Sequence, residues 1–400
     1  MTLFGKNRVW IVLALAMVLR IVWAVLVPVH PLSDAAMYDQ FARSIVGGQG
    51  YALSDGALTA YWPVGASALL AGAYAIFGPG GLATVMLNLV LGGLLVLVTQ
   101  LLAERRFGPR AGVVAGLMIA LWPTWIAMTT FPSSELPCAL FVFSAMLAWS
   151  DTRLSSVVRV AIATALLVAA GFMRPTVLPL IAALPLMDIL RHRSVRRTAR
   201  EMLVALVVMV TLIAPWAIRN YHVLGEPVPV STNFGVNLWM GNNARSTGLF
   251  MEFPETGLPT GEIERDAAFK KMAIDHIKSN PGHYLQLSVQ RAIATFSKET
   301  VGIYWNDQGL PEVLLTPLKV ISTLYWYLAL VVGLYGLFFL VRRDRWLVLA
   351  DPLILASGLV IAVAILVVGG DRYHLLLDPI LSILAGFGFH RKSAPAPATD

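Results

Sequence analysis

The stretch of sequence that decides the fold reads VWIVLALAMVLRIVWAVLVPVHPLSDAAMYDQFARSIVGGQG, residues 9–50. Its first half, residues 9–29, is an apolar run interrupted only by Arg20, and about 20 such residues let a helix cross a bilayer. The whole chain has this character: 57% of its 400 residues are hydrophobic, 13% are charged, and the mean hydropathy is +0.71. A soluble domain carries about twice that share of charge. The sequence therefore predicts an integral membrane protein of spanning helices, since a barrel would show short alternating segments.

Further apolar runs follow the first and predict an all-α polytopic membrane protein with about 10 transmembrane helices. We expect the first run to be an uncleaved anchor, because it is too long for the apolar core of a signal peptide. The predicted spans are 9–29, 82–103, 111–130, 133–149, 157–173, 175–190, 202–217, 320–341, 346–368 and 375–389.

Basic residues predict the orientation of these spans. Six clusters fall on one side of the membrane if both termini are cytoplasmic, and basic loops favour the cytoplasmic side. This distribution explains the net charge of +7 without nucleic acid. The clusters are Lys6 with Arg8; Arg105, Arg106 with Arg110; Arg153 with Arg159; Arg191, Arg193, Arg196, Arg197 with Arg200; Arg342, Arg343 with Arg345; and Arg391 with Lys392.

This topology divides the chain into four parts. Residues 1–218 form an N-terminal bundle that includes a first outer loop, 30–80, with interfacial helices. Residues 219–319 form an extracytoplasmic and interfacial region, and 320–390 form the C-terminal spans. Residues 391–400, rich in Ala and Pro, form a disordered cytoplasmic tail.

Two carboxylates lie at predicted outer ends of spans. Asp34 opens a short amphipathic helix that Ser33 can cap and that ends at the glycines after residue 46. Glu135 lies in FPSSELP, residues 131–137. Each acid either complements a helix dipole, worth under about 1 kcal/mol, or is a functional group at the membrane boundary.

Arginines on the same side raise a similar choice. Arg372 lies in the turn GGDRYHLLLDP, residues 369–379, and Arg174 follows the fifth predicted span. Each arginine either pairs with a neighbouring acid, such as Asp371 or Asp378, or binds a lipid phosphate through its planar fork.

Other outer segments suggest contacts with sugars or simply turns. The segment 230–248 is rich in Asn, Gly, Ser and Thr and includes Asn242, and Tyr61 lies in YWPVGAS, residues 61–67. The spacing of Cys and His residues shows no metal-ligand motif. We therefore expect no certain cofactor, and a divalent metal is possible but not indicated.

The order of these motifs resembles the GT-C superfamily of polyprenyl-phosphate-sugar-dependent glycosyltransferases, in particular the bacterial group related to protein O-mannosyltransferases and the lipid A aminoarabinose transferase. This chain departs from the family where Tyr61 and Trp62 precede the Pro63 turn instead of Arg-Pro, and where His374 replaces a second Arg. The matching elements are SDAAMY at 33–38, GGQGY at 47–51, the turn at 63–65, AIFG at 75–78, SSE at 133–135, MRP at 173–175, PWAIRN at 215–220, STNFGVNLWMGNN at 231–243 and DRYHLLLDP at 371–379.

The resemblance implies a GT-C bundle and an inverting transfer from a polyprenyl-phosphate sugar to a glycan, lipid or protein acceptor. The enzyme would lie in the bacterial cytoplasmic membrane, with its active site facing outside. Asp34 would be the base and Glu135 a second catalytic carboxylate. Arg372, with Arg174 or Arg219, would bind the donor phosphate. Tyr38, Asp39, Tyr61, Asn242, Tyr373 and His374 would contact substrate.

Three other functions remain open at this stage. A transporter or flippase of lipid-linked sugars is the main alternative, although transporters commonly show two related halves and broken helices at the midplane. A related-fold polymerase or ligase that uses a diphosphate-linked oligosaccharide is the second alternative. A non-catalytic assembly protein on the same scaffold is the third.

Overall fold

The computed structural model describes residues 3–252 and 257–391, so almost all of the predicted tail lies outside the described residues. The regular secondary structure of the described residues is helical, with one isolated β-bridge between Ala52 and Leu58. The α-helices are α1 (Leu3–Leu26), α2 (Asp34–Val46), α3 (Gly65–Phe77), α4 (Gly81–Phe107), α5 (Pro109–Leu121), α6 (Pro123–Ala127), α7 (Glu135–Trp149), α8 (Ser156–Met173), α9 (Leu180–His192), α10 (Val195–Leu224), α11 (Phe234–Gly241), α12 (Glu262–Ser279), α13 (Pro281–Phe296), α14 (Val301–Tyr304), α15 (Glu312–Asp344), α16 (Pro352–Leu366) and α17 (Leu377–Arg391). The 3-10 helices are η1 (Met128–Thr130), η2 (Pro175–Val177), η3 (Asp307–Gly309), η4 (Arg345–Ala350) and η5 (Asp371–His374).

Each predicted span overlaps at least one helix, but the lengths differ, and the spans 111–130, 175–190 and 346–368 each cover more than one helix. Among the described helices, α1, α4, α8, α10 and the stretch Glu312–Ala350 are long and apolar enough to cross a membrane. The α5–α6 pair is a sixth candidate if it counts as one span, because it bends by 58° where Pro123 interrupts the helix. Helices α7, α16 and α17 are apolar but shorter. The structure is thus an all-helical membrane fold with five or six candidate spans, and ten spans stay a prediction.

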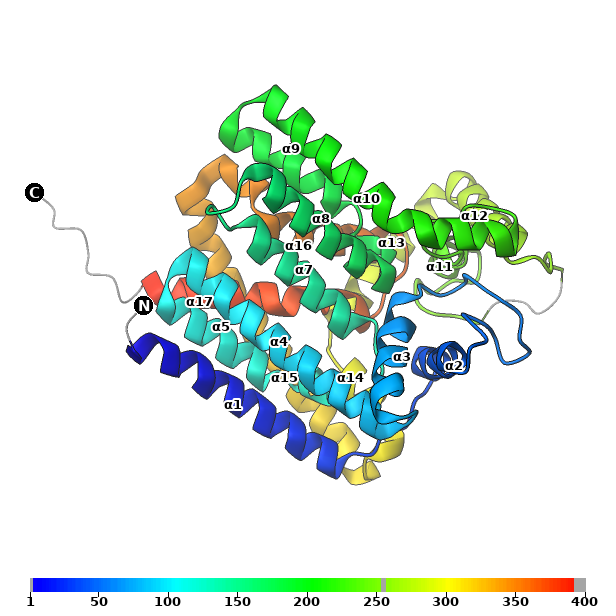
Figure 1. Ribbon diagram of the computed structural model, residues 1–400, viewed down its shortest axis with the longest axis horizontal. Coiled ribbons are helices and arrows are strands. Elements are labelled where there is room, and N and C mark those ends of the chain that lie inside the picture. The colour runs from blue at the N-terminus through cyan, green and yellow to red at the C-terminus, as the bar shows by residue number, and fades with distance from the viewer. Residues whose placement is uncertain (1–2, 253–256, 392–400) are drawn as a thin grey trace, which may run out of the picture.

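Helix α17 lies in the centre of the bundle and packs against α15, α5 and α4 (Figure 1). Its described side chains from Leu377 to Gly388 are all buried, as expected for a helix that is apolar all round. Glycines allow the close approach. A Cβ on Gly336 of α15 would lie 1.8 Å from the carbonyl oxygen of Leu384, and one on Gly386 would lie 2.4 Å from that of Ala111. Small residues at such contacts are typical of membrane helix pairs.

The two ends of the bundle differ in character. Helix α1 begins and α17 ends at one end, whereas α2, α3, α11 and α12 lie at the other (Figure 1). Arg106, Arg191 and Arg343, which come from three of the predicted cytoplasmic clusters, line one shared hollow. The structure therefore gathers these clusters in one place, while the orientation in the membrane stays a prediction.

The predicted outer parts fold against one another through Glu262 at the start of α12. Its carboxylate accepts bonds from the Thr59 hydroxyl at 2.6 Å, the Ala60 amide at 3.0 Å and the Thr232 hydroxyl. The predicted interfacial segment after residue 280 forms α13. The predicted part boundaries at 218 and 320 fall inside α10 and α15, because both helices continue into the outer region.

Candidate active site

Helix α2 carries Asp34 at its first position, as the sequence predicts. Its buried face includes Ala35, Tyr38 and Phe41, so packing against the bundle fixes its orientation. Ser33 is the N-cap residue, but the expected side-chain cap is wrong: its hydroxyl makes no capping bond to the described backbone. Its backbone has a positive φ of 50°, whereas a capping residue normally adopts the β region. Asp34 is therefore held by helix packing.

Four charged side chains from separate parts of the chain meet at the start of this helix: Asp34, Glu135, Arg174 and Arg372. Arg372, in η5, donates from Nη1 to Asp34 Oδ2 at 2.8 Å and from Nε to Glu135 Oε1 at 3.1 Å. Its Nη2 lies 2.9 Å from the same Glu135 oxygen. Arg174, just after α8, also donates to Glu135 Oε1. Residues separated by up to 338 positions thus form one network of two carboxylates and two guanidinium groups.

The two carboxylates of this network differ in exposure. The Glu135 side chain is 4% exposed and takes bonds from both arginines, whereas Asp34 is 31% exposed. The Ser134 hydroxyl donates to Glu135 Oε2 at 3.3 Å, which adds a contact on the buried side. Asp34 is consequently the carboxylate that a substrate can reach, and Glu135 is the one that holds the arginines.

Charge and burial act against each other at Arg372. Burial alone would lower the pKa of its guanidinium, but the carboxylates of Glu135 and Asp34 outweigh burial and raise that pKa well above its usual value. At the neighbouring Tyr38, burial first and then the same two carboxylates raise the pKa of the hydroxyl. Arg372 is therefore a permanent cation, and Tyr38 is a protonated donor.

Aromatic rings surround the two arginines. The Arg372 guanidinium carbon lies 5.2 Å from the ring centre of Trp305 and 5.8 Å from that of Tyr373. The corresponding distance from Arg174 to Tyr373 is 5.3 Å. Trp305 in turn stacks on Phe131 at 4.7 Å. These contacts orient both cations. Trp305 was not predicted from the sequence, because it lies in an outer segment without a recognisable motif.

A cleft opens from this charged network into the bundle. Glu135, Arg174, Arg372 and Tyr373 form its polar end, and the rest of its wall is almost entirely aliphatic. The aliphatic wall comes from η2, α9, α16 and the residues after η5: Val177, Leu180, Ala356, Leu359, Val360, Val363, Leu375 and Leu376. A cleft with cations at one end and an apolar wall beyond them suits a lipid with a phosphate head group.

The structure places several predicted site residues elsewhere. Asp39 pairs with Arg43 at 2.8 Å and accepts a bond from Tyr74, so it joins α2 to α3. Arg219 donates to the carbonyl oxygens of Thr59 at 2.7 Å and Tyr51 at 3.1 Å, which fastens the first outer loop to α10.

Asn242 and His374 are fully buried. Neither belongs to the described lining of the cleft. Asn242 donates to the Val367 carbonyl oxygen at 3.0 Å and accepts from Arg291 at 2.8 Å. These partners satisfy the amide inside the fold. Its predicted contact with substrate, like that of His374, stays a prediction.

Tyr61 occupies an intermediate position in the first outer loop. Its ring packs edge-on to Trp62 at 4.4 Å, and the Arg265 guanidinium lies 5.9 Å from its centre. Burial raises the pKa of Tyr61 to about 12, so its hydroxyl stays protonated at neutral pH. The predicted contact of Tyr61 with substrate stays a prediction, and its described ring contacts lie outside the Arg372 network.

The whole fold resembles solved structures of known enzymes. The oligosaccharyltransferase of Archaeoglobus fulgidus, in its apo form, matches with a TM-score of 0.60 and 15% identity over 97% of this chain and 51% of that one. The archaeal enzyme AglB, in complex with an inhibitory peptide and a dolichol-phosphate, matches with a TM-score of 0.53 and 14% identity over 97% and 50%. The chain has a GT-C fold. The resemblance inferred from the motifs is thereby confirmed at the level of the fold, and this chain spans about half the length of the archaeal enzyme.

Two further comparisons complete the description of this chain. ArnT from Cupriavidus metallidurans, bound to undecaprenyl phosphate, aligns with a TM-score of 0.48 and 16% identity over 96% of this chain and 78% of that one. A family model described as a domain of unknown function (DUF8201) matches residues 69–239. No curated protein matches the chain in sequence.

Proposed function

We propose that the chain is a membrane glycosyltransferase that moves a sugar from a polyprenyl-phosphate donor to a cell-envelope acceptor with inversion. The reaction takes place at the outer face of the cytoplasmic membrane. The acceptor is a glycolipid, a polysaccharide or a protein. One observation carries the proposal: Arg174 and Arg372 lie at the polar end of an otherwise aliphatic cleft, and Asp34 is bonded to Arg372.

The cleft accounts for donor binding. The polyprenyl chain lies along the aliphatic wall of α9 and α16, and its phosphate lies beside the two arginines. A guanidinium has five N–H donors, and three contacts of Arg372 are with Asp34 and Glu135. Further N–H groups of Arg372 and Arg174 are therefore free to bind phosphate oxygens. The dolichol-phosphate in the AglB complex is consistent with a lipid-phosphate ligand on this fold.

Asp34 is the base in this proposal. The acceptor hydroxyl attacks the anomeric carbon opposite the phosphate and loses its proton to the Asp34 carboxylate. The bond between that carbon and the phosphate oxygen breaks, and its electron pair leaves with the polyprenyl phosphate. Inversion follows because attack and departure are on opposite faces. Arg174 and Arg372 stabilise the charge that grows on the leaving phosphate.

Glu135 has a positioning role rather than a direct one. It is almost fully buried and holds both arginines through one oxygen. A carboxylate in that place sets the distance between the two guanidinium groups, and hence the phosphate site between them. The predicted catalytic role of Glu135 thus becomes indirect in this proposal.

The test is a direct assay of sugar transfer. Purified protein is incubated with a panel of polyprenyl-phosphate sugars, each labelled in the sugar, together with membrane extract. The proposal expects the label to move to an acceptor and free polyprenyl phosphate to form in equal amount, with one donor preferred. Movement of intact labelled donor across a vesicle membrane, with no free polyprenyl phosphate formed, would instead indicate a flippase.

A further inference from the structure

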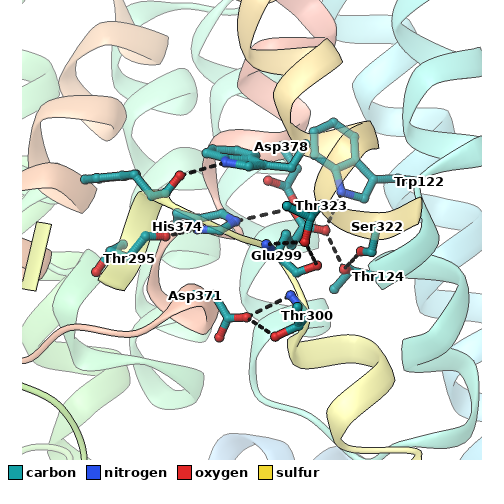
Figure 2. A network of polar contacts seen from close by, with 12 residues as sticks. Trp122, Thr124, Thr295, Glu299, Thr300, Ser322, Thr323, Asp371, His374 and Asp378 are labelled. Atoms are coloured by element: carbon teal, nitrogen blue, oxygen red, sulfur yellow. Dashed lines mark hydrogen bonds and ion pairs between the residues drawn. The ribbon is translucent and has the colours of Figure 1, made fainter. Parts of the chain in front are cut away.

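A second buried cluster of polar groups lies beside the active site and is distinct from it. Glu299 comes just before α14, His374 ends η5, and Asp378 lies in the first turn of α17. All three side chains are 0% exposed. One potential ligand atom from each lies within 4.8 Å of the other two. Figure 2 shows the three side chains converging from separate elements.

The tautomer of His374 follows from its partners. Its Nδ1 faces the carbonyl oxygen of Thr295, which can only accept, so Nδ1 carries a proton. Its Nε2 faces Glu299 Oε2 at 3.2 Å. Trp326 stacks on the ring at 4.0 Å and fixes its orientation. The Nε2 lone pair therefore points into the cluster.

In each of the two carboxylates, Glu299 and Asp378, one oxygen accepts hydrogen bonds from tryptophan or threonine side chains and the other does not. Glu299 Oε1 accepts from Trp122 Nε1 at 2.7 Å and from the Thr124 hydroxyl. Asp378 Oδ2 accepts from Trp125 Nε1 at 2.9 Å. Asp378 Oδ1 is buried and has no hydrogen-bond partner among the described residues. An unpaired buried carboxylate oxygen is costly, so it points to a missing ligand.

We propose that His374 Nε2, Glu299 Oε2 and Asp378 Oδ1 bind a divalent transition-metal ion such as Zn²⁺ or Mn²⁺. Two carboxylates and a neutral imidazole supply two negative charges, which the ion balances. Ligands about 2.0–2.1 Å from a tetrahedral ion lie roughly 3.3 Å apart, close to the 3.2 Å between His374 Nε2 and Glu299 Oε2. A metal-binding histidine commonly donates its other N–H to a carbonyl, as His374 does.

This ion would position the active site rather than take part in the reaction. His374 and Arg372 lie in the same short helix, η5. Asp371, at the start of η5, accepts bonds from the amide and hydroxyl of Thr300, both at 2.8 Å (Figure 2). An ion on His374, Glu299 and Asp378 would therefore fasten the turn that carries Arg372 to α17 and to the segment before α14.

The test measures metal content and thermal stability without any sugar donor, so its outcome is independent of the proposed transferase activity. Tag-free full-length protein is stripped with a chelator, exposed to Zn²⁺ or Mn²⁺ alone, and freed of unbound ion. We expect about one tightly held ion per chain and a rise in Tm on loading, because binding stabilises the folded state. Asp378→Asn and His374→Ala should lose both effects.

The control is His192→Ala in α9. His192 belongs to another group of His and acidic residues, but the acids of that group, Asp188 and Glu201, pair with Arg159 and Arg197. The control should keep the ion. Wild-type protein without bound metal after loading would overturn the proposal, even if a variant failed to fold. A second result would also overturn it: an Asp378→Asn protein with a higher Tm than wild type and no response to metal. That result would mean that the cluster holds a shared proton and not an ion.

Discussion

Glu135 is the residue on which the geometry of the charged site depends most. One of its oxygens accepts from both Arg174 and Arg372, and the carboxylate is almost fully buried. Removing one partner of a buried ion pair costs more than the pair contributes, because the remaining charge is left without compensation. This residue is also the point at which stability and function are coupled.

The variant Glu135→Gln should lower the free energy of unfolding by roughly 3 kcal/mol, the lower end of the range for a broken buried pair. The lower end applies because Arg174 and Arg372 reach solvent, with 15% and 26% of their side chains exposed. Thermal unfolding in detergent measures the loss. Glu226→Gln, at an exposed position after α10, is the control and should match wild type. Equal stability of both variants would contradict the positioning role of Glu135.

The sequence singled out the four charged residues that form one network in the structure, but not how they pair. Asp34, Glu135, Arg174 and Arg372 were all singled out, because an ionised side chain at a span end is unusual enough to be noticed. Their pairing could not be predicted, since it depends on the directions of side chains up to 338 positions apart. Arg219 shows that position alone does not reveal the partner of an arginine. Its place in the sequence resembles that of Arg174, but it donates to main-chain carbonyl groups of the first outer loop.

His374 and Asp378 illustrate a signal that was present in the sequence but not used. They are only four residues apart, with His374 at the end of η5 and Asp378 in the first turn of α17. Glu299, the third member of that cluster, is 75 positions from His374. Only the fold could bring it to the other two.

At the scale of elements, the packing of α15 against α17 decides whether the bundle forms. Gly336 has no room for a side chain, whereas a Cβ added to Gly358 in α16 would meet no described atom within 4 Å. The two positions form a matched pair of helical glycines.

Gly336→Ala should destabilise the protein by about 1–3 kcal/mol, because overpacking forces the two helices apart. Gly358→Ala should leave Tm unchanged or slightly higher, since it only reduces the freedom of the unfolded chain. Thermal unfolding of both variants under one condition provides the comparison. A stable Gly336→Ala protein would mean that α17 is not packed as closely as described.

Helix α16 supplies one wall of the proposed lipid cleft. Val363 lines the cleft, whereas Ile361, two residues earlier, is 41% exposed and does not belong to the described lining. Val363→Trp should fill the cleft and weaken binding of long-chain polyprenyl phosphate about tenfold or more, equal to 1.4 kcal/mol or more. Ile361→Trp should bind normally. If both variants bound the lipid equally well, the aliphatic cleft would not be the lipid site.

The positions of helices followed from apolar runs, whereas their ends did not. Helix α15 begins at Glu312 rather than near 320, and Pro317 lies inside it, in its first turns. The span predicted at 111–130 is broken at Pro123, where the ring removes a backbone donor. Hydropathy marks the apolar segment, but tertiary contacts decide where the hydrogen-bonded helix starts and bends.

For the whole molecule, the basic clusters predict one orientation in the membrane. In a Cys138→Ser background, a cysteine at Arg245 should react with a membrane-impermeant thiol reagent added outside intact cells. A cysteine at Arg196 should react only after the cells are opened, because positively charged loops stay inside. Both positions are exposed in the structure. The reverse pattern would place the charged site on the cytoplasmic side and contradict the proposed topology.

The central claim is that Asp34 takes the acceptor proton while Arg372 holds the leaving phosphate, and single-turnover kinetics with donor binding test it most directly. Asp34→Asn should lower the transfer rate roughly 100-fold or more, with donor affinity near that of wild type. Arg372→Ala should weaken donor binding and transfer together, by about 2 kcal/mol or more. Wild-type turnover by the Asp34→Asn enzyme would contradict the account, because the carboxylate could then be only a first-turn acid of α2.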